Sequence, residues 1–309
     1  MPKKTKSEIR KDYFLDKHVI ITPLRAKRPH DLESQPVKKN SNDCVLCPQG
    51  IEKDLILDYD GRSDSEWNTM VLKNKYPALT IDNPHAYGQQ EVIIESPIHT
   101  KELHEHSPDE LVTVFRTYIK RIAANALNHE INYILLFKNY GSQAGESLQH
   151  PHTQLFASHL LPPLIKNELK ETKKYETSFG TCPHCDIIRK EAKSERLVWQ
   201  DDNIIVIAPF ASEYHYELWF YSKRHADNLC SLNTGEIRSL AIFLKKALNK
   251  LVELNISYNF FTHEVVADKN QHFCLKLLPR DSVWAGVELS TGLIINSVPP
   301  EEAAKYYKN

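Results

Sequence analysis

The sequence predicts an α+β protein made of two similar halves, each a mainly antiparallel sheet with flanking helices. Three observations predict this class. A series of strand, helix and two further strands occurs twice, each copy follows a Cys-x-x-C pair, and the last strand of each copy begins with histidine. With 309 residues, 41% of them apolar, the chain is long enough for two such halves. We place them at residues 1–160 and 161–309.

Each half is expected to begin with an early strand, followed by an apolar strand that ends in a polar turn. The early strands lie near Val71 and Ile204, and the second strands cover residues 91–99 and 217–225. Aligning the second strands brings Glu, Ser and His into the same order in both copies. We interpret this agreement as a duplication of one unit.

An amphipathic helix follows each of these strands. Apolar residues recur at helical spacing, so that one face of each helix is apolar. Each start carries a capping side chain and a glutamate three residues later, which is the capping-box pattern. The pairs are Ser107 with Glu110, and Asn233 with Glu236.

Two more strands complete each half. The first covers residues 131–138 and 256–263, and the second begins with histidine and covers residues 150–156 and 272–278. The polar segment 159–181 between the halves is rich in Lys and Glu. We expect it to form a connecting helix or loop.

Two sets of cysteines and histidines accompany the repeats. A Cys-x-x-C pair binds one ion through two thiolates, and two histidines complete a four-ligand set that suits structural zinc. Because the histidines are distant in sequence, each ion would join separate strands. The predicted ligands are Cys44, Cys47, His99 and His150 in the first set, and Cys182, Cys185, His225 and His272 in the second. Iron in one site, or thiols without a metal, are the alternatives.

The strand that begins at His150 carries the predicted chemistry. Alternate strand residues share a face, so His150, His152 and Gln154 are expected to point the same way. If His150 binds the ion, the ring of His152 is free, and a neutral imidazole nitrogen can attack phosphorus. Gln154 can donate to a phosphate oxygen but supplies no proton. This favours transfer between phosphate groups over hydrolysis, for which a general acid is needed.

The loop at 141–147, just before this strand, is rich in Gly and Ser and can approach a phosphate. In the second half, Cys274 stands where the first half has His152, and Lys276 stands where it has Gln154. The second half is therefore predicted to keep its metal ligands and to lack the nucleophile.

The composition excludes several other classes. A net charge of −1 gives no indication of a nucleic-acid or membrane-surface partner. No apolar run approaches the roughly 20 residues of a membrane helix. The basic start is not followed by the apolar stretch of a secretory signal, so we expect a cytoplasmic protein.

The segment His150-Pro-His-Thr-Gln154 resembles the H-P-H-x-Q signature of the galactose-1-phosphate uridylyltransferase family, a branch of the histidine-triad superfamily. Residues 22–29 are similar to the family's N-terminal R-A-x-R-P segment, and residues 74–79 to its nucleoside-binding stretch. Residues 96–99 resemble its metal-ligand segment and residues 286–292 its C-terminal sugar-side segment. The resemblance covers nearly the whole chain.

This resemblance implies two histidine-triad-like halves and a ping-pong mechanism. His152 would attack the α-phosphorus of a nucleotide sugar, and a sugar 1-phosphate or phosphate would then take the nucleotide. The carbonyl of His150 would orient the ring of His152, and members often form homodimers. The implied substrate contacts are Gln154 and Ser147 on phosphate oxygens, Arg28 and Asn139 as phosphate supports, Arg25 beside them, Asn74 at the nucleoside and Glu288 at sugar hydroxyls.

The chain also departs from the family pattern. Thr153 stands where many uridylyltransferases have Gly, and Gln149 replaces a common Pro. The full Cys-x-x-C set of the second half looks more like the plant enzyme that phosphorolyses ADP-glucose. UMP is the expected group in transfer, and adenylyl transfer from ADP-glucose to phosphate is the alternative. A histidine-triad nucleotide hydrolase and a non-catalytic nucleotide- or zinc-binding scaffold are the remaining hypotheses.

Overall fold

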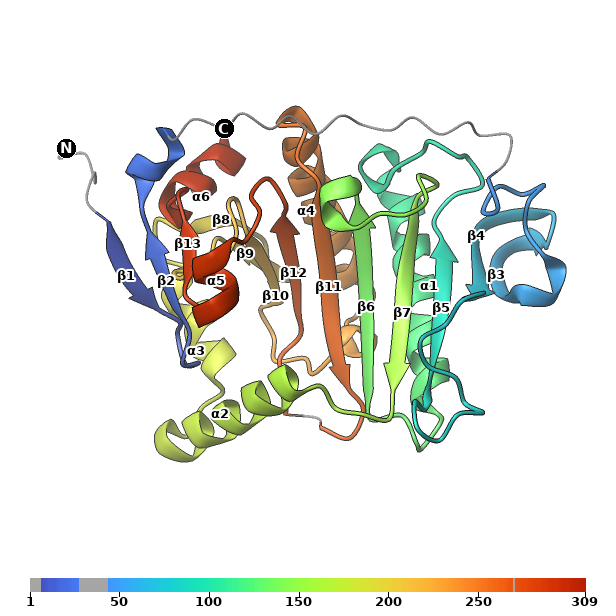
Figure 1. Cartoon of the computed structure of the whole chain (residues 1–309), viewed down its shortest axis with the longest axis horizontal. Coiled ribbons are helices and arrows are strands. Elements are labelled where there is room, and N and C mark those ends of the chain that lie inside the picture. Colours follow the sequence, from blue (N-terminus) through green and yellow to red (C-terminus); the bar gives the residue numbers. More distant parts are fainter. Residues whose placement is uncertain (1–6, 28–43, 269) are drawn as a thin grey trace.

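The two halves form one continuous sheet in the computed structural model, which describes residues 7–27, 44–268 and 270–309 (Figure 1). All neighbouring strands in this ten-stranded sheet are antiparallel. The order is β3 (Ile56–Ser63), β4 (Glu66–Lys73), β5 (Gly88–Ile94), β7 (His152–Ser158), β6 (Tyr133–Tyr140), β11 (Tyr258–Val265), β12 (Cys274–Pro279), β10 (Leu218–Ser222), β9 (Ile204–Ile207) and β8 (Leu197–Gln200).

The halves meet where β6 pairs with β11, from Tyr133 opposite Val265 to Tyr140 opposite Tyr258. The α+β class and the largely antiparallel sheet are thus confirmed. The strand between β5 and β6 begins at His152, two residues later than expected. His150 therefore lies just before β7.

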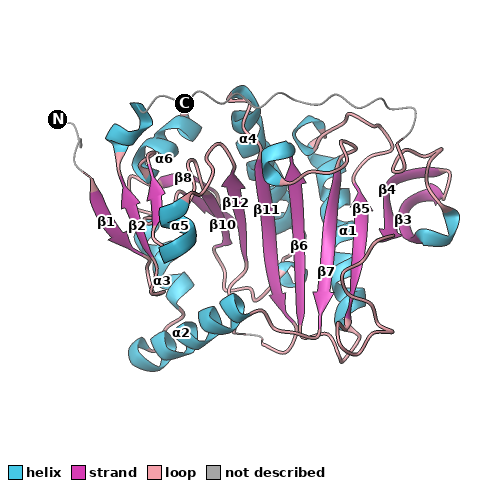
Figure 2. Ribbon diagram, viewed as in Figure 1, coloured by secondary structure: helices cyan, strands magenta, loops and turns pink. Residues whose placement is uncertain are grey.

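Two long helices, α1 (Pro108–Ala126) and α4 (Thr234–Glu253), cover one face of the sheet (Figures 1 and 2). Both predicted capping boxes are present, at Ser107 and Asn233. The apolar faces of the two helices pack on the sheet in a core shared by both halves, which includes Phe115 and Leu244. Burial of this apolar surface is the main stabilising contribution expected for such a layer.

The opposite face of the sheet is crossed near its lower edge by α2 (Pro163–Phe179), as Figure 1 shows. This is the segment expected as a connecting helix or loop, and it ends at Gly180, whose φ of 69° suits a helix C-terminus. The next helix, α3 (Pro183–Glu191), starts at the second Cys-x-x-C pair.

A small second sheet was not anticipated from the sequence. In it β2 (His18–Ile21) pairs with β1 (Glu8–Lys11) and, in parallel, with β13 (Ile294–Asn296). The N-terminal strands therefore lie against C-terminal residues. Around this sheet are α5 (Gly286–Thr291) and α6 (Pro300–Lys308), and short 3-10 helices cover Pro23–Lys27, Lys53–Leu55, Leu103–Glu105, Ser142–Ala144 and Leu229–Ser231.

The strands of the two halves match less simply than the sequence alignment suggests. Glu91 faces the helix layer, where it binds Arg121 of α1, whereas the aligned Glu217 accepts a hydrogen bond from the indole of Trp219 on the other face. A slip of one residue turns a strand side chain to the opposite face. The alignment is therefore wrong by one position at the glutamates. It holds at Ser96 and Ser222, whose carbonyls accept equivalent hydrogen bonds.

Among the helices in the described ranges, none has the length and apolar character needed to cross a membrane.

Candidate active site and metal centres

The first Cys/His set comes together at one end of β7. Cys47 Sγ lies 3.4 Å from His99 Nδ1 and 3.5 Å from His150 Nδ1, and Cys44 Sγ lies 3.8 Å from His150 Nδ1. His150 Nε2 donates to the carbonyl of Ser96 over 2.8 Å, which leaves Nδ1 free to face the thiols. The four predicted ligands thus converge on one point.

The second set repeats this geometry. Cys185 Sγ lies 3.4 Å from His225 Nδ1 and 3.5 Å from His272 Nδ1, and His272 Nε2 bonds the carbonyl of Ser222 at 2.8 Å. Cys182 completes the group, whose ligand atoms all lie within 4.8 Å of one another. Both sets lie where β7 or β12 begins. Because these two strands run in opposite directions, one set lies at each end of the strands (Figure 1).

Both sets fit a bound metal ion. Two sulfurs and two imidazole nitrogens are the donor set of a tetrahedral thiolate site, and each ring is oriented by a backbone carbonyl on its far nitrogen. The eight predicted residues thus form two groups that could each hold an ion.

His152 is oriented by the main chain beside the first set. Its Nδ1 lies 2.8 Å from the carbonyl oxygen of His150, the contact that the family resemblance implied. A carbonyl accepts only, so Nδ1 carries the proton and Nε2 keeps its lone pair. Burial lowers the pKa of His152 below its ordinary value, which favours the neutral, nucleophilic ring.

A buried ion pair lies under the same strand, on the helix side of the sheet. Lys138 Nζ donates to Glu95 at 2.7 Å and approaches the carbonyl of His152 at 3.4 Å. Tyr118 and Thr153 also donate to Glu95. Burial raises the pKa of Glu95, but the ammonium and these donors outweigh it and leave the pKa lowered. The sequence analysis did not predict this network, which holds the start of β7 from the helix side of the sheet.

The face that carries His152 also carries the predicted amide groups. Lys138 and Thr153 point to the helix layer, so their neighbours Asn139, His152 and Gln154 belong to the opposite face. Gln154 is half-buried between Val92 and Phe137 on the adjacent strands. Histidine and two amides therefore share one surface of the sheet.

The glycine-containing loop lies beside these groups. Gly141 and Gly145 have φ angles of 83° and 82°, a region that favours glycine. A side-chain carbon placed on Gly145 would lie 4.0 Å from the amide nitrogen of Asn139. Ser147, at the end of the loop, is exposed. The loop can therefore approach a ligand that binds Asn139.

Asn259 and Arg280 of the second half lie beside Asn139, and the sequence analysis predicted neither of them. Asn259 of β11 lies directly opposite Asn139, and its Nδ2 donates to Asn139 Oδ1 at 2.8 Å. Arg280 donates to Asn259 Oδ1 at 3.0 Å. The only signal in the sequence was an asparagine inside an apolar strand.

The remaining predicted substrate residues are more dispersed. Asn74 bonds Gln90 of β5 through its main chain and closes a turn by accepting from Tyr76, so it lies along the β5–β7 pair. Arg25 is exposed in the 3-10 helix after β2, a strand of the small sheet. Glu288 caps its own helix by accepting from the Ala285 amide at 2.9 Å. Arg28 lies outside the described residues.

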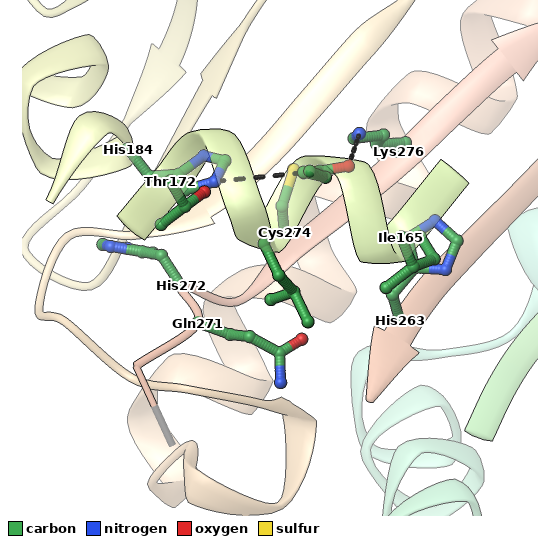
Figure 3. Close-up of a pocket in the computed structure, with 10 residues that line it drawn as sticks. Ile165, Thr172, His184, His263, Gln271, His272, Cys274 and Lys276 are labelled. Carbon is green, nitrogen blue, oxygen red and sulfur yellow. Dashed lines mark ion pairs between the residues drawn. The ribbon is translucent and has the colours of Figure 1, made fainter. Parts of the chain in front are cut away.

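In the second half, the place that corresponds to His152 is partly covered by α2. Figure 3 shows Ile165 and Thr172 of α2 beside Cys274 and Lys276, around a cavity of about 50 Å³. Lys276 Nζ lies 4.0 Å from Glu168 of α2. Burial raises the pKa of the Cys274 thiol to about 12, and the neutral thiol is a poor nucleophile.

The fold and the site define the protein class. A duplicated α+β sheet with an oriented histidine, two amides and a glycine loop at one end of its strands is an arrangement that suits nucleotidyl transfer. Residues 1–162 match the family model of the galactose-1-phosphate uridyl transferase N-terminal domain. The chain belongs to the galactose-1-phosphate uridylyltransferase family.

Two relatives are similar along almost the whole chain. ADP-glucose phosphorylase of Arabidopsis thaliana is 33% identical, over 96% of this chain and 91% of that protein. Galactose-1-phosphate uridylyltransferase of Thermotoga maritima is 26% identical, over 96% of both chains. The crystal structure of the Arabidopsis enzyme with bound ADP-glucose covers 98% of this chain at a TM-score of 0.87 and 30% identity.

Proposed function

We propose that the protein transfers a nucleoside monophosphate from a nucleotide sugar to a phosphate acceptor through a covalent nucleotidyl-His152. The observation that carries this proposal is the 2.8 Å contact of His152 Nδ1 with the His150 carbonyl. It leaves Nε2 as the free nucleophile on the face that also carries Gln154 and Asn139. Those two side chains and Ser147 would hold the phosphate oxygens.

The transfer needs two displacements at the same phosphorus. In the first, Nε2 of His152 forms a bond to the α-phosphorus, and the bond to the bridging oxygen breaks. The electron pair leaves on the sugar 1-phosphate, a stable anion that needs no proton from the enzyme. In the second, an acceptor phosphate oxygen attacks, and the electron pair of the N–P bond returns to the ring. Gln154, which supplies no proton, supports transfer over the hydrolase alternative.

The first candidate reaction is uridylyl transfer between sugar 1-phosphates. Membership of the family and the Thermotoga relative support it. In this reaction the acceptor is a hexose 1-phosphate, and Glu288 would bind sugar hydroxyls.

The second candidate is adenylyl transfer from ADP-glucose to phosphate. Three observations favour it: the 33% identity to the plant phosphorylase, the TM-score of 0.87 to its ADP-glucose complex, and the complete second Cys/His set. Both candidates use the same nucleophile, so the nucleobase is the difference to be measured.

We further propose zinc as the ion of both Cys/His sets, with iron in one of them as the alternative. The ion would supply structural cross-linking between strands. In this proposal residues 1–160 form the catalytic half and residues 161–309 the supporting half. We also propose a homodimer, because members of the family often pair. A cytoplasmic location stays a prediction.

Intact mass spectrometry after mixing the protein with UDP-glucose or ADP-glucose, without acceptor, tests the proposal. We expect a UMP or an AMP adduct that is absent in His152→Ala, and the mass identifies the base. An adduct that persists in His152→Ala would assign the nucleophile elsewhere. Turnover by the wild type with no adduct from either donor would contradict the covalent step.

A further inference from the structure

A row of three polar side chains crosses the border between the halves on the active-site face. Arg280, just after β12, donates from Nη1 to Asn259 Oδ1 at 3.0 Å. Asn259 Nδ2 donates to Asn139 Oδ1 at 2.8 Å. Asn139 is the only member from the first half. The row therefore joins the second half to a residue that the proposed function places at the phosphate.

The chemistry of arginine gives this row a direction. A guanidinium donates hydrogen bonds and accepts none, so the oxygen of Asn259 must face Arg280. The amide nitrogen of Asn259 then faces Asn139 and requires an oxygen there. The nitrogen of Asn139 therefore points away from the row. It lies near Gly145 of the loop, 4.0 Å from the position that a side-chain carbon on this glycine would occupy. Arg280 thus decides which end of the Asn139 amide a ligand meets.

The same row also holds the loop. Asn259 Nδ2 donates a second hydrogen bond to the carbonyl of Ala144 at 2.9 Å, inside the loop that precedes Ser147. Arg280 is itself fixed, because its guanidinium lies 5.5 Å from the ring centre of Tyr214. One amide of the second half therefore positions both a side chain and a backbone segment of the first.

We propose that Asn259 and Arg280 are positioning residues of the nucleotidyl transfer, which orient Asn139 so that its amide nitrogen donates to a substrate phosphate. The inference rests on the proposed function, in which Asn139 is a phosphate contact. If the amide turned over, its oxygen would face the phosphate oxygens and repel them. The second half then serves the reaction through this row.

Asn259→Asp is the decisive variant. It keeps the size of the side chain and its bond from Arg280, but it replaces the donor that faces Asn139 with an oxygen. Asn139 must then turn its nitrogen toward the introduced carboxylate to pair with it. A role in packing alone would be little affected, whereas the proposed role predicts a fall in kcat on the order of 100- to 1,000-fold, as for loss of one donor to a developing anion.

Two further variants separate orientation from stability. Arg280→Lys keeps a donor and should retain most of the activity, while Arg280→Met should lose activity as Asn259→Asp does. Asn203→Asp is the matched control, because Asn203 donates to Ser239 at 3.1 Å in the second half, away from the row. Asn203→Asp should lower the melting temperature about as much as Asn259→Asp does, but it should leave kcat/KM unchanged.

The experiment is a double-mutant cycle on the rate of nucleotidyl-enzyme formation, with Asn139→Ala as the second change. If Asn259 acts mainly through Asn139, the loss caused by Asn259→Asp should be much smaller in the Asn139→Ala background, where only its bond to the Ala144 carbonyl is left to lose. Independent, additive losses, or an unaltered rate in Asn259→Asp, would overturn the inference. Binding of inorganic pyrophosphate, measured by calorimetry, is a second readout that needs no turnover. It should weaken about tenfold in Asn259→Asp, and equal binding would refute the inference even if the wild type formed no adduct.

Discussion

The two halves agree at their metal-ligand ends and differ at the next residue of functional importance. His150 and His272 make the same 2.8 Å bond to a serine carbonyl and the same 3.5 Å approach to a cysteine sulfur. Two residues further on, one half has His152 and the other has Cys274. The two halves therefore share the Cys/His framework, and one of them has the histidine that is the proposed nucleophile.

The second half has acquired contacts that the first half lacks. Its equivalent surface lies under α2, where Glu168 meets Lys276, and its strand β11 supplies Asn259 to the first half. In the proposed function, a half without the nucleophile would thus still contribute structure and orientation. The predictions below test this division of roles, beginning with the largest effect.

Replacement of the two equivalent residues should separate the halves most clearly. His152→Ala removes the nucleophile, and we expect kcat to fall on the order of 10⁴-fold or more. Cys274→Ala should leave kcat within about twofold, because this half-buried thiol lines the pocket under α2, none of whose lining residues is a proposed substrate contact. Steady-state assays with the donor identified by mass spectrometry measure both. Comparable losses in the two variants would mean that the second half also takes part in the chemistry.

Local sequence patterns predicted the parts of this structure that depend on neighbours in the chain. The capping boxes at Ser107 and Asn233 and the two Cys-x-x-C pairs are of this kind, because each is complete within a few residues. The distant histidines were assigned correctly to each set because the repeat marked equivalent positions. The repeat thus supplied information on spatial proximity that a single copy of the pattern does not contain.

Features that depend on strand register or on distant pairing were not predictable in this way. Glu91 and Glu217 align in sequence but face opposite sides, since a slip of one residue changes no local pattern. The pairing of β2 with β13 joins segments from the two ends of the chain. In the sequence, Asn259 is one polar residue within a strand. Only the pairing of β11 with β6 places it opposite Asn139.

The equivalent metal ligands give the next contrast. His150→Ala and His272→Ala should each lower the bound metal by one equivalent, measured by elemental analysis, and each should reduce the melting temperature. His150→Ala should also reduce nucleotidyl-enzyme formation strongly, because the His150 ring, bonded to the Ser96 carbonyl, fixes the main-chain carbonyl that orients His152. His272→Ala should affect adduct formation much less. Equal effects on the adduct would contradict the division into catalytic and supporting halves.

The smallest expected effect concerns the ion pair under α2. Burial raises the pKa of Glu168, but Lys276 and other nearby positive charges outweigh it, so the folded pKa lies below the ordinary value of 4.5. A lowered folded pKa contributes stability above the unfolded value, and this contribution is lost as the pH falls through the folded pKa. Glu168→Gln should therefore reduce the free energy of unfolding by about 1 kcal/mol near neutral pH.

Urea unfolding as a function of pH measures this contribution. The difference between the wild type and Glu168→Gln should be largest near neutral pH and should close at acidic pH, once the wild-type carboxylate is protonated. Glu171→Gln on the same helix is the control, because its partner Lys174 is largely exposed and an exposed pair contributes little. A difference that persists unchanged into acid would show that Glu168 stabilises α2 by packing and not by its charge, and the position of α2 would then depend on apolar contacts such as those of Ile165 and Leu169.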